Sequence, residues 1–171
     1  MATYTLISSN VLTSSAASVT FSAIPSTYTD LVVRASARSD RALVTDNYLI
    51  ELNGSATAVY SRTSLLNNGG TPQSSNATPQ AFWVALYADA ANATSGTFGS
   101  AELYIPNYAG STNKVASSFS VQEDNTTAGY LSANAHLWGN TSAITQIKIS
   151  PSATQNWVSG SSFYLYGISN A

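Results

Sequence analysis

The chain has 171 residues, of which 44% are apolar and only 8% charged, and its net charge is −2. This length suits one domain whose core needs no disulfide or metal to stabilise it. The six basic residues are too few and too scattered for a nucleic-acid-binding surface, and the absence of cysteine excludes thiol catalysis and zinc–thiolate sites. No membrane-spanning run and no signal peptide are evident, so we expect a protein made in a cytoplasm.

Alternation of apolar and polar residues predicts strands along most of the chain. Serine and threonine are abundant, with 28 and 19 copies, whereas the helix-favouring residues glutamate and lysine are rare. In chain order, strands are predicted over residues 4–7, 17–22, 31–37, 48–52, 58–61, 81–88, 99–105, 115–121, 130–138, 145–149 and 163–168. We therefore predict a single all-β domain over residues 1–171, a jelly-roll-like β-sandwich of two antiparallel sheets.

Two polar segments are predicted to be loops. Residues 67–80 form the longest stretch without strand character, and a second polar stretch covers residues 89–97. A long loop in a compact domain is often functional or contacts a partner, although a tolerated insertion is an equal alternative.

The single histidine invites comparison with a catalytic triad. His136 could pair with one of many serines and with Asp124 or Asp46, but no Gly-x-Ser-x-Gly elbow surrounds any serine. It alternates with apolar residues on the polar side of a predicted strand, next to Trp138. We therefore expect a surface or interface histidine and no catalytic role.

Carboxylates are the other candidates for chemistry. A glycosidase needs a convergent pair, for which Asp40 with Asp46 and Glu123 with Asp124 are available, but neighbours on a strand point to opposite faces. Calcium could bind these same four side chains, yet the EF-hand spacing is absent. We expect no enzyme activity, no cofactor and no metal.

Two groups of residues are candidates for an interface. Arg34, Arg38 and Arg41 are half of the basic residues, and they predict either a subunit contact or intrachain salt bridges to nearby carboxylates. Aromatic side chains are the second group of interface candidates. Trp83, Tyr130 and Trp138 are candidates for a surface that stacks on sugar rings or, as we favour, on another subunit.

Several strings resemble the small β-sandwich virion structural proteins of tailed bacteriophages, especially cyanophages and marine phages. They are YTLISSNVL at residues 4–12, SVTFSAIP at 18–25, YTDLVV at 28–33, IPNYAGS at 105–111 and GSSFYLYGI at 160–168. Proteins of this kind occur in capsid decoration and in tail appendages. The resemblance therefore implies a location on the virion surface and carries over no functional residues.

We expect a capsid decoration, or cement, protein that stabilises the head by binding the major capsid protein. It would be made in the host cytoplasm and assemble as a homotrimer, without nucleic acid or membrane. The first alternative is a tail-fibre or appendage module that binds host saccharide, with contacts from Trp83, Trp138, Trp157 and residues 67–80. A carbohydrate-binding module of cellular origin is a further alternative.

Overall fold

A computed structural model describes residues 2–125, 129–152 and 154–169, which form twelve strands and no helix. None of these residues therefore belongs to a helix that could cross a membrane. The strands are β1 (Thr3–Val11), β2 (Val19–Phe21), β3 (Asp30–Ala37), β4 (Thr45–Leu52), β5 (Tyr60–Asn67), β6 (Gln73–Gln80), β7 (Trp83–Asp89), β8 (Gly99–Pro106), β9 (Lys114–Gln122), β10 (Tyr130–Trp138), β11 (Ile147–Ser150) and β12 (Ser162–Ser169).

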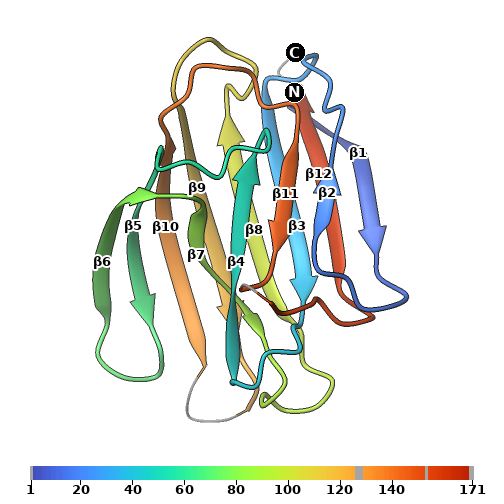
Figure 1. Ribbon diagram of the computed structural model, residues 1–171, viewed down its shortest axis with the longest axis vertical. Helices are drawn as coiled ribbons and strands as arrows, with labels where there is room; N and C mark the ends of the chain where they lie inside the picture. Colours follow the sequence, from blue (N-terminus) through green and yellow to red (C-terminus); the bar gives the residue numbers. More distant parts are fainter. Residues whose placement is uncertain (1, 126–128, 153, 170–171) are drawn as a thin grey trace.

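The strands form two antiparallel sheets (Figure 1). One has eight strands in the order β1-β12-β3-β8-β9-β10-β5-β6, and the other has four in the order β2-β11-β4-β7. Four of the pairings nest inside one another along the chain: β1 with β12, β2 with β11, β3 with β8, and β4 with β7. Nested pairing of this kind folds eight strands into a jelly roll, so the predicted all-β sandwich is confirmed.

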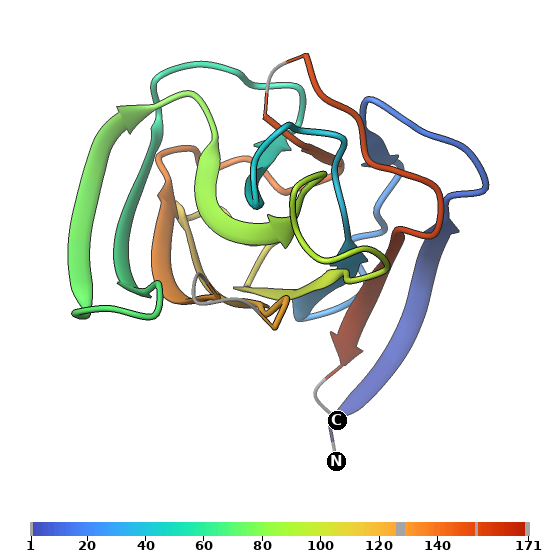
Figure 2. The ribbon, with the colours of Figure 1, turned by 90° about the horizontal axis from the view of Figure 1, so that it is seen from below.

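Two strand pairs, β5–β6 and β9–β10, are insertions in the eight-stranded jelly roll. They add to the β8 side of the larger sheet, which therefore extends beyond the smaller one. Figure 2 shows the β5–β6 hairpin at one side of the molecule and β1 at the opposite side. Among the strands of the smaller sheet, β7 is the one that reaches over the extension, where it contacts β9, β10 and β5.

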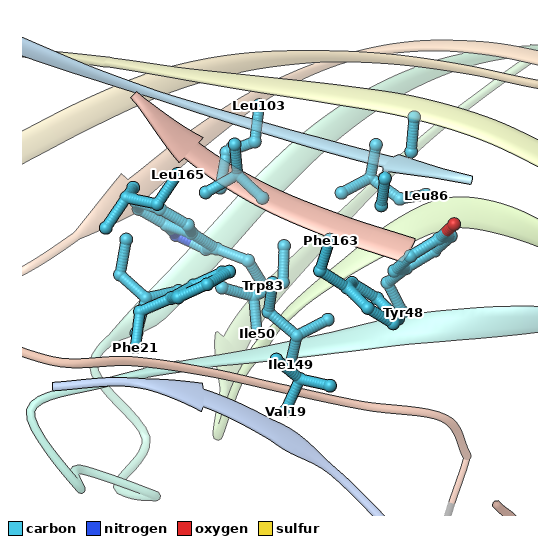
Figure 3. Close-up of a cluster of buried hydrophobic side chains, with 14 of the residues drawn as sticks. Val19, Phe21, Tyr48, Ile50, Trp83, Leu86, Leu103, Ile149, Phe163 and Leu165 are labelled. Atoms are coloured by element: carbon cyan, nitrogen blue, oxygen red, sulfur yellow. The ribbon is translucent and has the colours of Figure 1, made fainter. Parts of the chain in front are cut away.

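The hydrophobic core lies between the sheets (Figure 3). In β11, Ile147 and Ile149 are buried while Lys148 between them is partly exposed, which is the period-two pattern of a half-buried strand. Aromatic rings fill much of the core. Tyr48 and Phe163 both pack against Trp157, with ring centroids 4.9 and 5.6 Å away.

The prediction of a loop over residues 67–80 is wrong for most of its length, because β6 occupies Gln73–Gln80. This edge strand is almost entirely exposed and is held by backbone pairing to β5 alone. It buries no apolar face, so its sequence carries no alternation of apolar and polar residues. The predicted loop at 89–97 is confirmed, between β7 and β8.

Candidate interaction surface

The polarity of β5, β9 and β10 is inverted relative to the rest of the sandwich. Their outward side carries large exposed apolar side chains: Leu65, Val115, Phe119, Leu131 and Leu137. Their inward side carries buried polar side chains: Ser64, Ser118, Ser120, Ser132, Asn134 and His136. We call the outward side of these three strands the apolar face. Exposed apolar side chains that gather on one face are typical of a surface that another molecule covers.

The inward polar layer exists because β7 crosses directly over it. The backbone N–H of Tyr87 donates to Ser120 Oγ at 3.0 Å, and the indole Nε1–H of Trp83 donates to the Leu137 carbonyl at 2.9 Å. Small hydroxyl side chains leave room for these large rings, and one of them, Ser120, accepts the backbone hydrogen bond of Tyr87. The interior of this region is therefore filled from β7, and the apolar side chains of β9 and β10 are left to face outward.

Hydrogen bonds join the side chains of the polar layer to one another. Ser118 Oγ lies 2.8 Å from His136 Nε2, and Ser120 Oγ lies 2.9 Å from Ser132 Oγ. The Asn134 amide donates to Ser118 Oγ at 3.1 Å and to Ser132 Oγ at 3.3 Å. A buried polar group that is hydrogen-bonded costs little, so this layer is compatible with a stable fold.

The expected surface position of His136 is wrong, since only 2% of this residue is exposed. Burial, with a smaller contribution from the Arg62 charge, lowers the pKa of His136 to about 4. The Ser118–His136 contact has the spacing of a nucleophile and its base, but both side chains are buried and Nδ1 has no partner among the described residues. A triad needs a carboxylate at that nitrogen. Among the described residues, no carboxylate therefore completes a triad at His136 Nδ1.

The three candidate arginines form contacts within the chain. Arg34, which is exposed on β3, pairs with Glu102 of β8 at 2.8 Å, and Arg41 pairs with the buried Asp46 at 3.2 Å. Arg38 holds the loop between β7 and β8. Its guanidinium donates at 2.8–3.2 Å to four backbone carbonyls, those of Ala91, Ala93, Thr94 and Thr97. Arg34 and Arg41 therefore form the intrachain salt bridges of the second alternative, whereas Arg38 bonds backbone carbonyls of its own chain.

Replacing Arg38 by alanine is expected to loosen the β7–β8 loop, because four carbonyls lose a charged donor. Amide exchange over residues 90–98 should become faster, as followed by hydrogen–deuterium exchange with mass spectrometry. Lysine at this position should not restore protection, since one ammonium cannot span four acceptors in the way a planar guanidinium does. Arg34→Ala is the control, because it removes one exposed ion pair far from the loop. Unchanged exchange in Arg38→Ala would contradict the assignment.

The tryptophan candidates are not at the surface. Trp83, Trp138 and Trp157 have no exposed area, so the prediction that Trp83 and Trp138 belong to an interface is wrong in this fold. Both stack near Tyr60, the first edge-on at 6.1 Å and the second nearly parallel at 6.3 Å. Tyr130 is partly exposed, and its ring stacks on that of Tyr87 at 4.9 Å.

The candidate carboxylates Asp40 and Asp46 bind different partners. Asp40 accepts hydrogen bonds from the backbone and side chain of Asn156, and Asp46 is paired with Arg41. Over the described ranges, no three histidine, aspartate or glutamate side chains come together as metal ligands would.

The site residues that sequence reasoning missed are those of the apolar face. Strict alternation placed Leu131, Ala133, Ala135 and Leu137 on one side of a strand. The apolar side of a half-buried strand usually faces the core, whereas here it faces outward. No protein-family model matches this chain, and no curated protein matches its sequence.

Proposed function

We propose that this protein is a structural component of a tailed-bacteriophage virion, a capsid decoration protein that stabilises the head by binding the major capsid protein. The observation that carries the proposal is the apolar face. Leu65 of β5, Phe119 of β9 and Leu131 of β10 are 46–56% exposed on three adjacent strands whose inward side carries buried polar side chains. A chain that functions alone in water has no use for this arrangement, whereas a component of an assembly does.

Composition gives the proposal further support. Only 8% of the residues are charged, so copies can crowd on a particle without strong mutual repulsion. A sandwich with nested long-range pairing presents a rigid surface, and many weak contacts repeated by capsid symmetry add up through avidity. The position on the outer capsid surface is part of this proposal. The homotrimer expected from the sequence is the alternative to the two-fold contact argued below.

The tail-appendage alternative has less support. It relied on Trp83, Trp138, Trp157 and residues 67–80 as saccharide contacts, and the three tryptophans are fully buried. Stacking on a sugar ring needs an exposed aromatic face, so these tryptophans cannot serve that purpose in the folded chain.

The test is the copy number of this protein in purified virions of the phage that encodes it. Quantitative mass spectrometry would compare the chain with the major capsid protein of the same particles. A ratio close to one, or to a fixed simple fraction, is the expected result. A ratio typical of tail proteins would move the chain to the tail, and its absence from the particle would overturn the proposal altogether.

A second measurement tests the proposed activity. Heads that lack this protein should release DNA at a lower temperature than complete heads, and added purified chain should restore the difference. Heads with unchanged stability would contradict a cementing role.

A further inference from the structure

We propose that the apolar face is covered by the same face of a second copy of this chain, in a two-fold contact that stacks β9 and β10 of one copy on β9 and β10 of the other. The inference deepens the proposed function and rests on it, because it proposes how two copies join in the assembly and leaves the other surfaces of the chain to bind the major capsid protein. A two-fold contact between identical faces produces a dimer.

The strand register arranges the outward side chains of the apolar face in four rows. In the order β9, β10, β5, the rows are Val115, Leu137 and Ser61; Ser117, Ala135 and Thr63; Phe119, Ala133 and Leu65; and Val121, Leu131 and Asn67. The second row contains only small side chains, while the third contains the largest. A shallow hollow of about 250 Å³ lies over the first two rows, lined in part by Val115, Ala135 and Leu137.

This order of rows is complementary to itself. A two-fold axis that runs across the strands, between the second and third rows, places the third row of one copy over the second row of the other. Phe119 then lies over the small side chains Ser117 and Ala135, and the same contact forms a second time by symmetry. The first row faces the fourth, so Val115 and Leu137 meet apolar side chains. Sheets packed face to face interdigitate in this way, with strands closely aligned.

Charge does not oppose the contact. Among the rows on β5, β9 and β10 every side chain is uncharged. On the neighbouring strand, Glu102 is level with Phe119 and Tyr104 is level with Ser117. The same axis therefore places Glu102 over Tyr104 rather than over a second glutamate. The exposed partner of Glu102, Arg34, neutralises its charge within the same copy.

The available area is sufficient for a stable contact. Strands lie about 4.8 Å apart and rise about 3.3 Å per residue, so five strands from β3 to β5 cover roughly 600 Å² in each copy. Two copies would bury roughly 1,200 Å² in total, which reaches the lower end of specific interfaces. The three strands of the apolar face alone would not bury this much area, so the proposed contact includes the outward side of β8 and β3.

The first experiment measures the mass of the purified chain in solution by sedimentation velocity and native mass spectrometry. We expect a dimer. Phe119→Lys should weaken the dimer by about 10-fold or more, because it places a charge against the partner's apolar rows. Val115→Lys and Val11→Lys form a matched pair, since both valines are 56% exposed and only Val115 lies on the apolar face. The first should weaken the dimer, and the second should leave it intact.

A second set of variants tests the register of the rows. Ser117→Phe adds apolar surface but fills the row that receives Phe119, so it should weaken the dimer. Non-specific adhesion would instead be strengthened by the same change. The exchange Ser117→Phe with Phe119→Ser should restore the dimer, because the second and third rows of opposite copies still combine one large and one small side chain. Circular dichroism and thermal melting would verify that each variant is folded.

A monomer at all soluble concentrations would overturn the inference, as would an oligomer that Phe119→Lys leaves intact. A trimer would overturn the two-fold arrangement. These outcomes are separate from the copy-number test. A monomer that is abundant in virions would contradict only the self-contact, and a dimer that is absent from virions would contradict only the proposed function.

Discussion

Alanine at Trp83 is expected to lower the free energy of unfolding by about 3–5 kcal/mol, the range for deleting a large buried aromatic side chain. The ring is fully buried where β7 passes over the extended sheet, packed edge-on against Tyr60 at 6.1 Å and tilted against His136 at 5.3 Å. Its Nε1–H also donates to the Leu137 carbonyl. The substitution would leave a cavity and an unpaired carbonyl between the sheets.

Chemical denaturation followed by far-ultraviolet circular dichroism would measure this loss without depending on tryptophan fluorescence. Trp83→Phe should show a smaller loss, since it keeps an aromatic ring and removes the indole hydrogen bond. Phe82→Ala is the matched control at the adjacent position, where the side chain is only partly buried. Equal losses for Phe82→Ala and Trp83→Ala would show that Trp83 has no special role in joining the sheets.

Acidification is expected to destabilise the protein by about 3 kcal/mol through His136, because one pKa unit corresponds to about 1.4 kcal/mol. Its pKa is about 4 in the fold, against 6.5 for an ordinary histidine. The unfolded chain therefore takes up a proton first as the pH falls. The contribution of His136 to stability is complete above pH 6.5, declines between pH 6.5 and about 4, and is constant below that range.

The main physical reason is burial, which removes the water that would stabilise a charged imidazole. A charged imidazole also needs acceptors for both ring nitrogens. Nε2 contacts Ser118, while Nδ1 has no hydrogen-bond partner among the described residues. The positive charge of Arg62 also disfavours protonation.

Unfolding free energies measured from pH 8 to pH 4 would test this, with His136→Gln as the non-titrating comparison. The slope between pH 6.5 and 4 should be shallower in the variant. Asp89 acts in the opposite direction at low pH, because burial raises the pKa of its carboxyl, so the difference between the two proteins isolates the histidine. Identical slopes would contradict a neutral, buried His136.

Strand positions were predictable because a strand's period of two is a local property. Residues 130–138 were predicted with the same limits as β10, and residues 99–105 differ from β8 by one residue. Composition added the fold class, since a chain this poor in helix-forming residues and this rich in alternation folds as sheets. Among the described residues, β6 was missed entirely, because it buries no apolar side and so leaves no pattern to detect. The strand predicted over 58–61 covers only the first two residues of β5.

The side of β9 and β10 that faces the interior could not be read from the same alternation. A polar side and an apolar side are both visible in residues 130–138, but the pattern alone does not say what will cover either. Here Trp83 lies against the inner side and binds the carbonyl of Leu137, which is 54 residues away in sequence. The inner side therefore carries the polar side chains of the strand. The burial of His136 and the exposure of Phe119 follow from that single crossing of β7.

Local periodicity therefore determined that the chain forms many short strands in a sandwich. Tertiary structure decided which of those strands carry an outward apolar face, because the choice depends on a long-range packing partner. The same reason explains why the sequence did not predict the contacts of the arginines or the burial of the tryptophans. Whether a side chain contacts another part of the chain or solvent is decided only when distant strands come together.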